Sequence, residues 1–288
     1  MRTDDATDCC LERRGEPVAA EATAAVTSAE TAKTMRDLRS TTRGEGSLAT
    51  VRLALVSDQH GNDVAFRAVV ADLDRTGADE VVCLGDVVQG GVEPAETLER
   101  LRALGCATVL GNADAFLLEV PEDSPEPVTQ RQLEVREWTL SQLSPAQLEQ
   151  IRSFAPFVRL ETDSVTLLLF HGSPSSYDDV LLPELGNEAV APFLGHAADL
   201  LAGGHTHLQW SRRIEDGLYV NPGSIGISYD RHADPLVLRP LAEWALVTVE
   251  NGTAGVEFRQ VPYSADDVRS AAAVSGRPYA DEWAAQWA

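Results

Sequence analysis

Apolar runs of strand length alternate with amphipathic stretches of helix length from residue 51 onward. The apolar runs predict buried strands at 51–57, 79–86, 107–114, 165–174 and 198–207. Apolar positions spaced three and four apart predict helices at 62–76, 94–104, 128–153 and 187–196. Asn62 is placed to cap the first of these helices, and Ser144-Pro145 is expected to divide the third into two.

The second half of the chain has the sequence pattern of β-hairpins. Short strands are expected at 210–214, 218–220, 244–249 and 255–261, with a turn at Glu250-Asn251-Gly252 between the last two. The stretch from Ala265 onward is expected to be helical and peripheral. Strand–helix units followed by antiparallel strands predict an α/β fold in which two sheets pack together and helices cover the outside.

Residues 1–48 differ from the rest, because they are rich in Ala, Thr, Ser, Glu and Arg and have almost no large apolar side chains. Such a segment buries too little apolar surface to offset chain entropy, so we expect it to be disordered. The expected organisation is a disordered N-terminal extension at 1–48, a folded domain at 49–264 and a helical C-terminal tail at 265–288.

The charge balance narrows the possible partners. The chain has 45 acidic and 23 basic residues, which gives a formal net charge of −22. So acidic a surface repels phosphate backbones and anionic lipid, so we expect neither a nucleic-acid docking surface nor membrane binding. An anionic substrate needs a locally positive site, which bound metal ions would supply. With no apolar stretch of membrane-spanning length and no signal-peptide core, the expected location is cytoplasmic; the oligomeric state is left open.

Side chains able to bind a metal follow each of the five predicted buried strands. The strand exits are Asp58-Gln59-His60, Gly85-Asp86, Gly111-Asn112-Ala113-Asp114, His171-Gly172 and Gly203-Gly204-His205-Thr206-His207. Ligands of open α/β sheets bind outside the carboxyl ends of the strands, so we expect these side chains to converge in one crevice. In the last motif only a turn would bring both imidazoles together, because alternate strand positions face opposite sides.

Each motif taken alone also has a purely structural interpretation. A lone aspartate is more often a cap or turn residue, and a lone histidine after an apolar strand is more often part of a core. The combination favours metal binding, since four of the six histidines fall in these motifs, whereas His196 and His232 are assigned to structure or surface. Mixed nitrogen and oxygen donors suit Mn²⁺, Fe, Zn²⁺ or Ni²⁺. Eight candidate donors are enough for two ions about 3.5–4 Å apart, which can hold a bridging hydroxide and clamp an in-line phosphoryl displacement.

In this order, the motifs D-x-H, G-D, G-N-x-D, H-G and G-H-T-H resemble the calcineurin-like metallophosphoesterase superfamily. Its small bacterial phosphodiesterases, which carry G-N-x-D in place of G-N-H-E/D, look nearest. The resemblance runs from about 51 to 263 and includes "NPGSIG" at 221–226. It implies a four-layer αββα sandwich of two mixed sheets flanked by helices, with a dimetal site at the sheet edges.

The resemblance also assigns roles to individual residues. It implies that Asp86 bridges two divalent ions, with Mn²⁺ favoured, and that Asp114 orients a water or the leaving group. The residues expected to take part in catalysis are Asp114 and His205. The other implied ligands are, for one ion, Asp58, His60 and His207, and, for the other, Asn112, His171 and His205.

One position departs from the phosphomonoesterase pattern. Where those members carry the histidine of G-N-H, thought to act as general acid, this chain has Ala113. The favoured function is therefore hydrolysis of small-molecule phosphoesters, diesters rather than monoesters. The alternatives are a phosphomonoesterase acting on nucleotides or phosphoproteins, and a catalytically silent metal-binding scaffold of the same fold.

Overall fold

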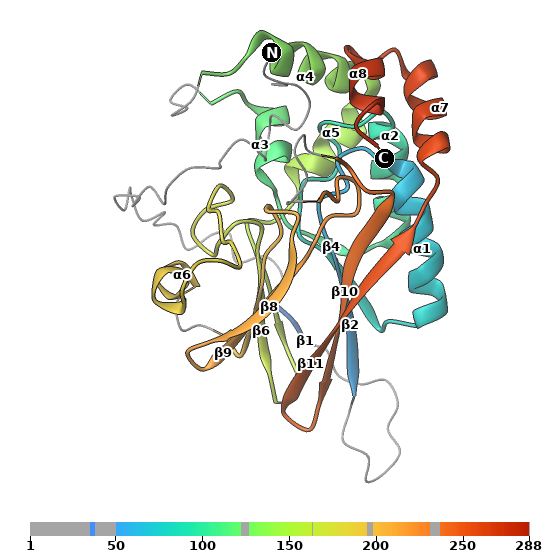
Figure 1. Ribbon diagram of the computed structural model, residues 1–288. Helices are drawn as coiled ribbons and strands as arrows, with labels where there is room; N and C mark the ends of the chain where they lie inside the picture. The colour runs from blue at the N-terminus through green and yellow to red at the C-terminus, as the bar shows by residue number, and fades with distance from the viewer. Residues whose placement is uncertain are drawn as a thin grey trace.

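The strands of the molecule form two mixed sheets (Figure 1). The computed structural model describes residues 35–37, 50–121, 127–162, 164–194, 198–230 and 237–287. A five-stranded sheet has the order β11-β10-β2-β3-β4: Thr253–Pro262, Leu241–Glu250, Val51–Val56, Glu80–Cys83 and Ala107–Thr108. A six-stranded sheet has the order β1-β5-β6-β7-β9-β8: Met35–Asp37, Val158–Glu161, Thr166–Leu169, Leu200–Ala202, Gly217–Pro222 and Gln209–Ile214. Strands β2, β3 and β4 are parallel, as are β6 and β7.

Strand β2, inside the five-stranded sheet, is buried on both faces. Along β2, Leu53 and Leu55 point into the core between the sheets, while Ala54 and Val56 join a second core beneath helices. The apolar runs are therefore nearly continuous rather than alternating, as buried parallel strands require. The inner core also takes side chains from the six-stranded sheet, among them Leu160, Leu167 and Leu169.

Helices cover the two outer faces, which confirms the four-layer αββα sandwich. Against the five-stranded sheet pack α1 at Asp63–Thr76, α2 at Pro94–Leu104, α3 at Asn112–Leu118 and α5 at Pro145–Arg152, with α4 at Gln130–Gln142 above them (Figure 1). The other outer face is covered by α6 at Asn187–Leu194, whose Val190 and Leu194 contact the β6–β7 region. Two predicted caps are present: Asn62 Oδ1 accepts from Ala65 N at 3.0 Å, and Ser144 caps α5.

The sequence-based prediction was wrong in the third βα unit. Strand β4 ends at Thr108, and residues predicted as strand from 112 onward begin α3 instead. The apolar pattern "ATVL" does not reveal this, because the helix is started by Asp114, whose carboxylate accepts from Gly111 N within the first turn. Strand β5 was also missed, although Val158 and Leu160 alternate with polar residues as a strand requires. Strand β1 falls within the N-terminal extension, of which the rest lies outside the described residues.

The C-terminal residues form α7 at Ala265–Ser275 and α8 at Ala280–Ala284, helical as predicted. They are less peripheral than expected, because Trp283 and Trp287 are buried with their ring centroids 4.3 Å apart. This core also includes Val92 and Ile227, which lie in loops beside the strand ends. Before these helices, β10 and β11 form the predicted hairpin, turning at Asn251 and Gly252 in the left-handed region.

No helix in the described ranges is long and apolar enough to cross a membrane. The two histidines assigned to structure or surface, at positions 196 and 232, lie outside the described residues.

Candidate metal centre

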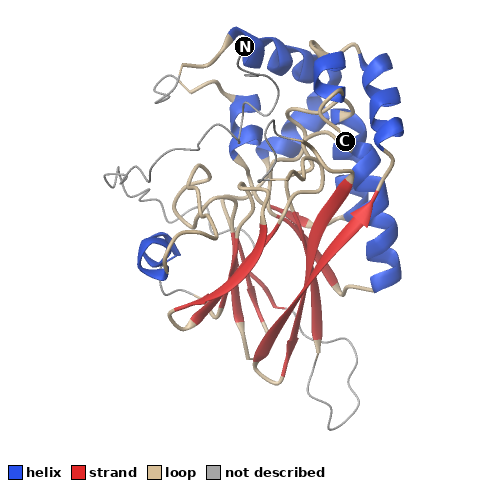
Figure 2. Ribbon diagram, in the orientation of Figure 1, coloured by secondary structure: helices blue, strands red, loops and turns tan. Residues whose placement is uncertain are grey.

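The seven predicted ligands gather at one end of the molecule, where strands of both sheets run into loops (Figure 2). Two motifs leave the five-stranded sheet after β2 and β3, and α3 begins with Asn112 after β4. The other two leave the six-stranded sheet after β6 and β7. Because the carboxyl ends of these parallel strands meet between the sheets, residues up to about 150 positions apart become neighbours.

The first cluster contains Asp58, His60 and His207, all buried. Its two imidazoles face each other, with 3.1 Å between His60 Nε2 and His207 Nε2. Asp58 Oδ1 lies 3.2 Å from His207 Nε2 and 3.9 Å from His60 Nε2. Three potential donor atoms therefore point at a common centre.

The second cluster contains Asp86, His171 and His205, again all buried. His171 Nε2 lies 3.2 Å from Asp86 Oδ2 and 2.9 Å from the amide oxygen of Asn112. The ligand atoms of the three titratable residues lie within 4.8 Å of one another. Asn112 thus joins this cluster as predicted from the sequence.

Asp86 connects the two clusters. Its Oδ2 is 3.2 Å from His171 Nε2 in the second cluster and 3.6 Å from His60 Nε2 in the first. Its Oδ1 accepts a hydrogen bond from Ala113 N at 2.8 Å, which fixes the carboxylate plane. One carboxylate oxygen between two sets of imidazoles is the arrangement that a bridging ligand requires.

Backbone carbonyl groups determine which nitrogen of each imidazole is free. His60 Nδ1 lies 2.8 Å from Gln89 O, His171 Nδ1 lies 2.7 Å from Leu84 O, and His207 Nδ1 lies 3.1 Å from Ile227 O. A carbonyl oxygen only accepts, so Nδ1 carries the proton and Nε2 presents a lone pair. In the neutral rings, lone pairs of His60 and His207 would then face each other and an acidic oxygen. A cation between them removes this repulsion, so the donor set fits a metal ion.

Two orphaned atoms point to the same conclusion. Among the described residues, Asp58 Oδ1 and His205 Nδ1 are buried without a hydrogen-bond partner. An unpaired buried carboxylate oxygen or imidazole nitrogen carries a desolvation penalty of about 1–3 kcal/mol or more, which ligation to a metal would offset. Each cluster contains one of these atoms, in keeping with two ions rather than one.

The pKa values of the buried groups reflect both their burial and the charges of their close neighbours. Burial disfavours the imidazolium of His171, but Asp86 and Asp58 outweigh it and raise the pKa of His171 to about 10. Burial and the neighbouring His171 lower the pKa of His205 to about 3. Burial opposes ionisation of Asp86, yet His171 followed by His60 and His205 hold the pKa of this carboxyl well below its usual range. The carboxylates of the site thus favour a positive charge among them.

Five of the candidate ligands have a strained backbone conformation. Eight described non-glycine residues have positive φ, and five of them are Asp58, His60, Asp86, His205 and His207, with φ between 47° and 67°. Each such conformation costs roughly 1–3 kcal/mol and persists where the surroundings enforce it, commonly at functional sites. The turn needed to bring both imidazoles of G-H-T-H together is therefore present.

Two glycines of the motifs are required by close approach. A Cβ on Gly111 would lie 2.0 Å from Asp86 Oδ1, and a Cβ on Gly204 would lie 2.7 Å from Asp58 Oδ2. Neither contact is sterically possible. The glycines of G-N and G-H therefore make room for the carboxylates that define the site.

The residue predicted to orient a water or the leaving group, Asp114, lies behind the bridging carboxylate. Its Oδ2 accepts from Asp86 N at 2.8 Å and from Gly111 N at 3.2 Å, and its Oδ1 accepts from Val87 N at 2.9 Å. These bonds hold the backbone at Asp86 in its strained conformation. Burial and Asp86 raise the pKa of Asp114 to about 7. Ala113, the neighbouring position, is buried and adds only a methyl group.

Sequence reasoning missed the residues that support the ligand loops. Asn221 Nδ2 donates to Gly204 O at 2.6 Å and to Thr206 Oγ1 at 3.1 Å, and Ser224 Oγ donates to Asp58 O at 2.8 Å. Both residues belong to "NPGSIG", which begins in the last two residues of β9. A polar, glycine-containing run directly after a buried strand was the available signal, but it does not say which loops the side chains hold.

Fold and site together describe an α/β sandwich protein with two candidate metal-binding clusters at its strand ends, which fit a dinuclear site. Residues 51–241 match the model of the calcineurin-like phosphoesterase superfamily domain, and the chain belongs to this superfamily.

Individual relatives are distant. The uncharacterised protein MJ0912 from Methanocaldococcus jannaschii is 25% identical over 181 residues, which are 62% of this chain and 72% of that protein. The crystal structure of a metallophosphoesterase from Sphaerobacter thermophilus has a TM-score of 0.60 at 24% identity and covers 82% of this chain and 97% of that chain. That of the hypothetical protein PH1004 from Pyrococcus horikoshii has a TM-score of 0.65 at 18% identity, covering 79% and 94%. These structural likenesses support the fold.

Proposed function

We propose that this protein hydrolyses phosphoesters, diesters in preference to monoesters, with two divalent metal ions. The observation that carries the proposal is the position of Asp86 Oδ2, between His60 Nε2 of one cluster and His171 Nε2 of the other. When bound, two divalent ions supply an activated water and neutralise the phosphoryl oxygens.

The side chains have separate tasks in this proposal. Asp58, His60 and His207 hold one ion, and Asn112, His171 and His205 hold the other, with Asp86 shared. The carbonyl groups behind the imidazoles keep each Nε2 directed at its ion. Asp114 positions Asp86 through the backbone. Mn²⁺ is the proposed metal because nitrogen and oxygen ligands without thiolate suit it.

The proposed diester preference depends on Ala113. A methyl group cannot protonate a leaving oxygen, and a positioned general acid contributes about 10²- to 10⁴-fold. Each of the four histidines that the structure describes already belongs to a cluster, so none of these imidazoles is left over as the acid. Esters whose leaving group departs as a stable anion should therefore be favoured. A diester also brings one less negative charge to a protein of net charge −22.

The test is a leaving-group series measured on the protein loaded with Mn²⁺. We expect kcat/KM for aryl phosphodiesters to fall steeply as the pKa of the leaving phenol rises, and to exceed kcat/KM for alkyl monoesters. A flat dependence on leaving-group pKa, or faster turnover of the alkyl monoester, would show that another group delivers the proton and that the substrates are monoesters. Binding of two Mn²⁺ with no turnover of any ester would favour the scaffold instead.

A further inference from the structure

The C-terminal tail reaches the metal centre through a buried arginine. Arg277 lies between α7 and α8, and only 6% of its surface is exposed. Its Nε donates to Gly90 O at 3.1 Å and its Nη1 donates to Pro278 O at 2.8 Å, while the guanidinium carbon lies 5.6 Å from the ring centroid of Trp283. This residue lies outside 51–241, the range that matches the family model.

The carbonyl group that Arg277 binds is next to the one that binds His60. In the loop after Asp86, Gln89 O lies 2.8 Å from His60 Nδ1, and the following carbonyl, of Gly90, accepts from Arg277. The base of this loop is held separately, because Gly61 N donates to Val87 O and Gly61 O accepts from Val92 N. His60 and Arg277 therefore contact two consecutive carbonyl groups at the loop tip.

Gly90 makes this tip dependent on an external contact. Its φ of +112° lies in the region that favours glycine, and glycine has more conformational freedom than any other residue. The peptide between Gln89 and Gly90, which carries the carbonyl group that contacts His60, can therefore rotate unless a neighbour fixes it. Arg277 is such a neighbour, with a donor in hydrogen-bond distance of the Gly90 carbonyl.

The burial of Arg277 indicates that this contact is more than incidental. The guanidinium bonds to backbone carbonyls rather than to a carboxylate among the described residues, and burial together with the nearby Arg131 lowers the pKa of Arg277 to about 10. A buried charge without an opposite partner is expensive, and a neutral residue could anchor a tail. Its planar donors are, however, well suited to fix two carbonyl groups at once.

We infer that Arg277 is a positioning residue for the metal centre, holding the Gln89–Gly90 loop tip so that His60 Nε2 stays directed at its ion. The inference rests on the metal centre of the proposed function and does not depend on which ester is hydrolysed. Partners that orient a ligating histidine typically contribute 10- to 100-fold to metal affinity. Arg277 acts one residue further away, so about 10-fold is expected.

The experiment compares Mn²⁺ binding to the full-length apo-protein by calorimetric titration in wild type, Arg277→Ala and Arg269→Ala. Arg269 is the matched control, because it anchors the same tail by donating to Trp287 O at 3.0 Å and does not contact the loop. We expect Arg277→Ala to weaken one of two Mn²⁺ sites about 10-fold and leave the other within about twofold. Its kcat should return to near the wild-type value at saturating Mn²⁺. Arg269→Ala should keep both affinities while losing thermal stability.

If Arg277→Ala and Arg269→Ala gave the same Mn²⁺-binding isotherm, the inference would be overturned. Arg277 would then serve only to anchor the C-terminal tail. A kcat/KM that stays low at saturating Mn²⁺, with unchanged isotherms, would overturn it in favour of direct contact with substrate. If circular dichroism shows that Arg277→Ala does not fold, Arg277→Lys takes its place, because one ammonium group cannot span both carbonyl groups. A smaller loss at the same site is then expected, and no loss overturns the inference. Wild type that binds no Mn²⁺ would refute the metal centre itself.

Discussion

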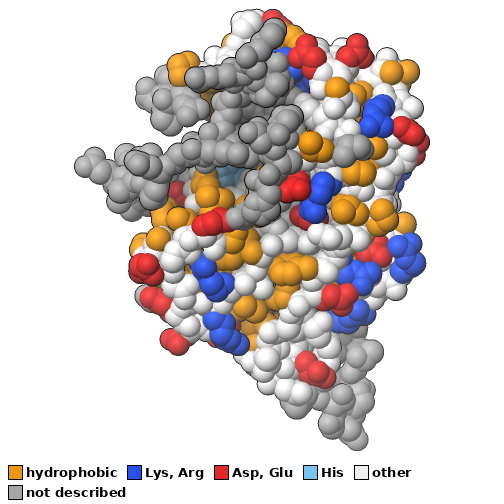
Figure 3. Space-filling model, in the orientation of Figure 1, with side chains coloured by type: hydrophobic (Ala, Val, Ile, Leu, Met, Phe, Trp, Pro, Cys, Tyr) orange, Lys and Arg blue, Asp and Glu red, His pale blue; other side chains and the backbone are white. Residues whose placement is uncertain are grey.

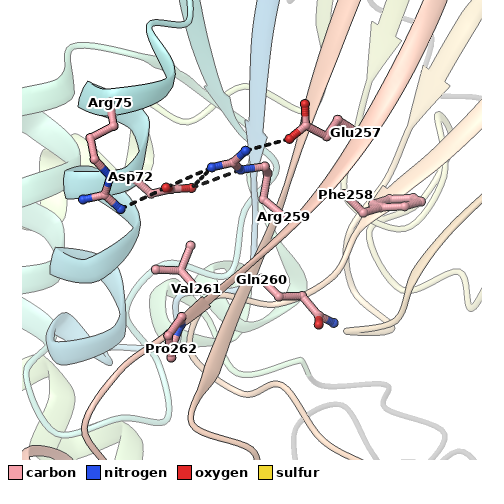
Figure 4. Close-up of a pocket in the computed structure, with 8 residues that line it drawn as sticks. All are labelled: Asp72, Arg75, Glu257, Phe258, Arg259, Gln260, Val261 and Pro262. Carbon is pink, nitrogen blue, oxygen red and sulfur yellow. Dashed lines mark hydrogen bonds and ion pairs between the residues drawn. The ribbon is translucent and has the colours of Figure 1, made fainter.

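Two groups of buried carboxylates in this molecule have opposite surroundings. The carboxylate of Asp72 in α1 receives only hydrogen-bond donors. Arg75 Nη2 and Arg259 Nη2 lie 3.0 Å from one oxygen (Figure 4). Trp244 Nε1 donates to the other oxygen at 3.1 Å. We call these four residues the Asp72 network. Asp58 and Asp86, at the candidate metal centre, face the Nε2 atoms of imidazoles whose Nδ1 atoms lie against backbone carbonyls.

The difference separates a structural site from a functional one. The Asp72 network is complete within the protein and ties α1 to β10 and β11. Asp72, Arg75 and Arg259 line a surface groove of about 320 Å³, yet the Asp72 carboxylate already has donors on both oxygens and needs no ligand. The metal centre is incomplete, because its acceptors face one another without enough donors. Donor–acceptor balance, rather than the size of a hollow, therefore identifies where a cation and its chemistry belong.

The largest effect should come from changing the bridge. Asp86→Asn keeps the shape but removes the negative charge between two ions, so we expect loss of at least one bound Mn²⁺. Activity should fall by more than the 10- to 100-fold typical of residues behind the ligands. The measurements are metal content by elemental analysis and kcat/KM for an aryl diester.

Folding is the control for this variant. The far-UV circular dichroism of Asp86→Asn should match that of wild type, and added Mn²⁺ should raise the Tm of wild type more than that of the variant, since ligand binding stabilises the native state by mass action. A variant that retains two ions and most of its activity would contradict the bridging role.

The Asp72 network should respond in the opposite way. Asp72→Asn leaves the Arg259 guanidinium and the Trp244 indole with a weaker acceptor, and we expect a loss of about 1–3 kcal/mol in the free energy of unfolding. Tm should fall by about 2–4 °C for each kcal/mol in a domain of this size. Mn²⁺ content and kcat/KM should stay within about twofold of wild type. A variant of normal stability with impaired turnover would mean that the groove serves the reaction.

The contrast also explains what the sequence could predict. The candidate metal ligands can be recognised in the sequence because His60, His171 and His207 each follow a buried strand, and parallel strands bring their ends together. The Asp72 network has no such signal, since Asp72 and Arg259 are separated by 187 positions and belong to elements of different kind. The role of Arg277 could not be predicted from the sequence either, because its contact with Gly90 depends on how the C-terminal helices pack. The start of helix α3 was not predicted, because Asp114, which caps it through Gly111 N, lies within what looked like the end of a strand.

The smallest predicted effect concerns the negative electrostatic field of the protein around the metal centre. On the face shown in Figure 3, acidic and basic side chains of the described residues are interspersed, and the basic ones form no continuous patch. With a net charge of −22, the protein should repel an anionic substrate at long range and attract it only at the metal ions. Raising the ionic strength from 0.01 to 0.1 M shortens the Debye length from about 30 to about 10 Å, so kcat/KM for a diester should rise by less than about twofold. The stability difference between wild type and Asp72→Asn should shrink slightly over the same range, because Arg75 and Arg259 are 67% and 31% exposed and are screened. Salt would then raise kcat/KM at the metal centre and lower the contribution of the Asp72 network to stability.

A steep fall of kcat/KM with salt, measured at constant Mn²⁺ saturation, would instead require a basic docking surface for the substrate.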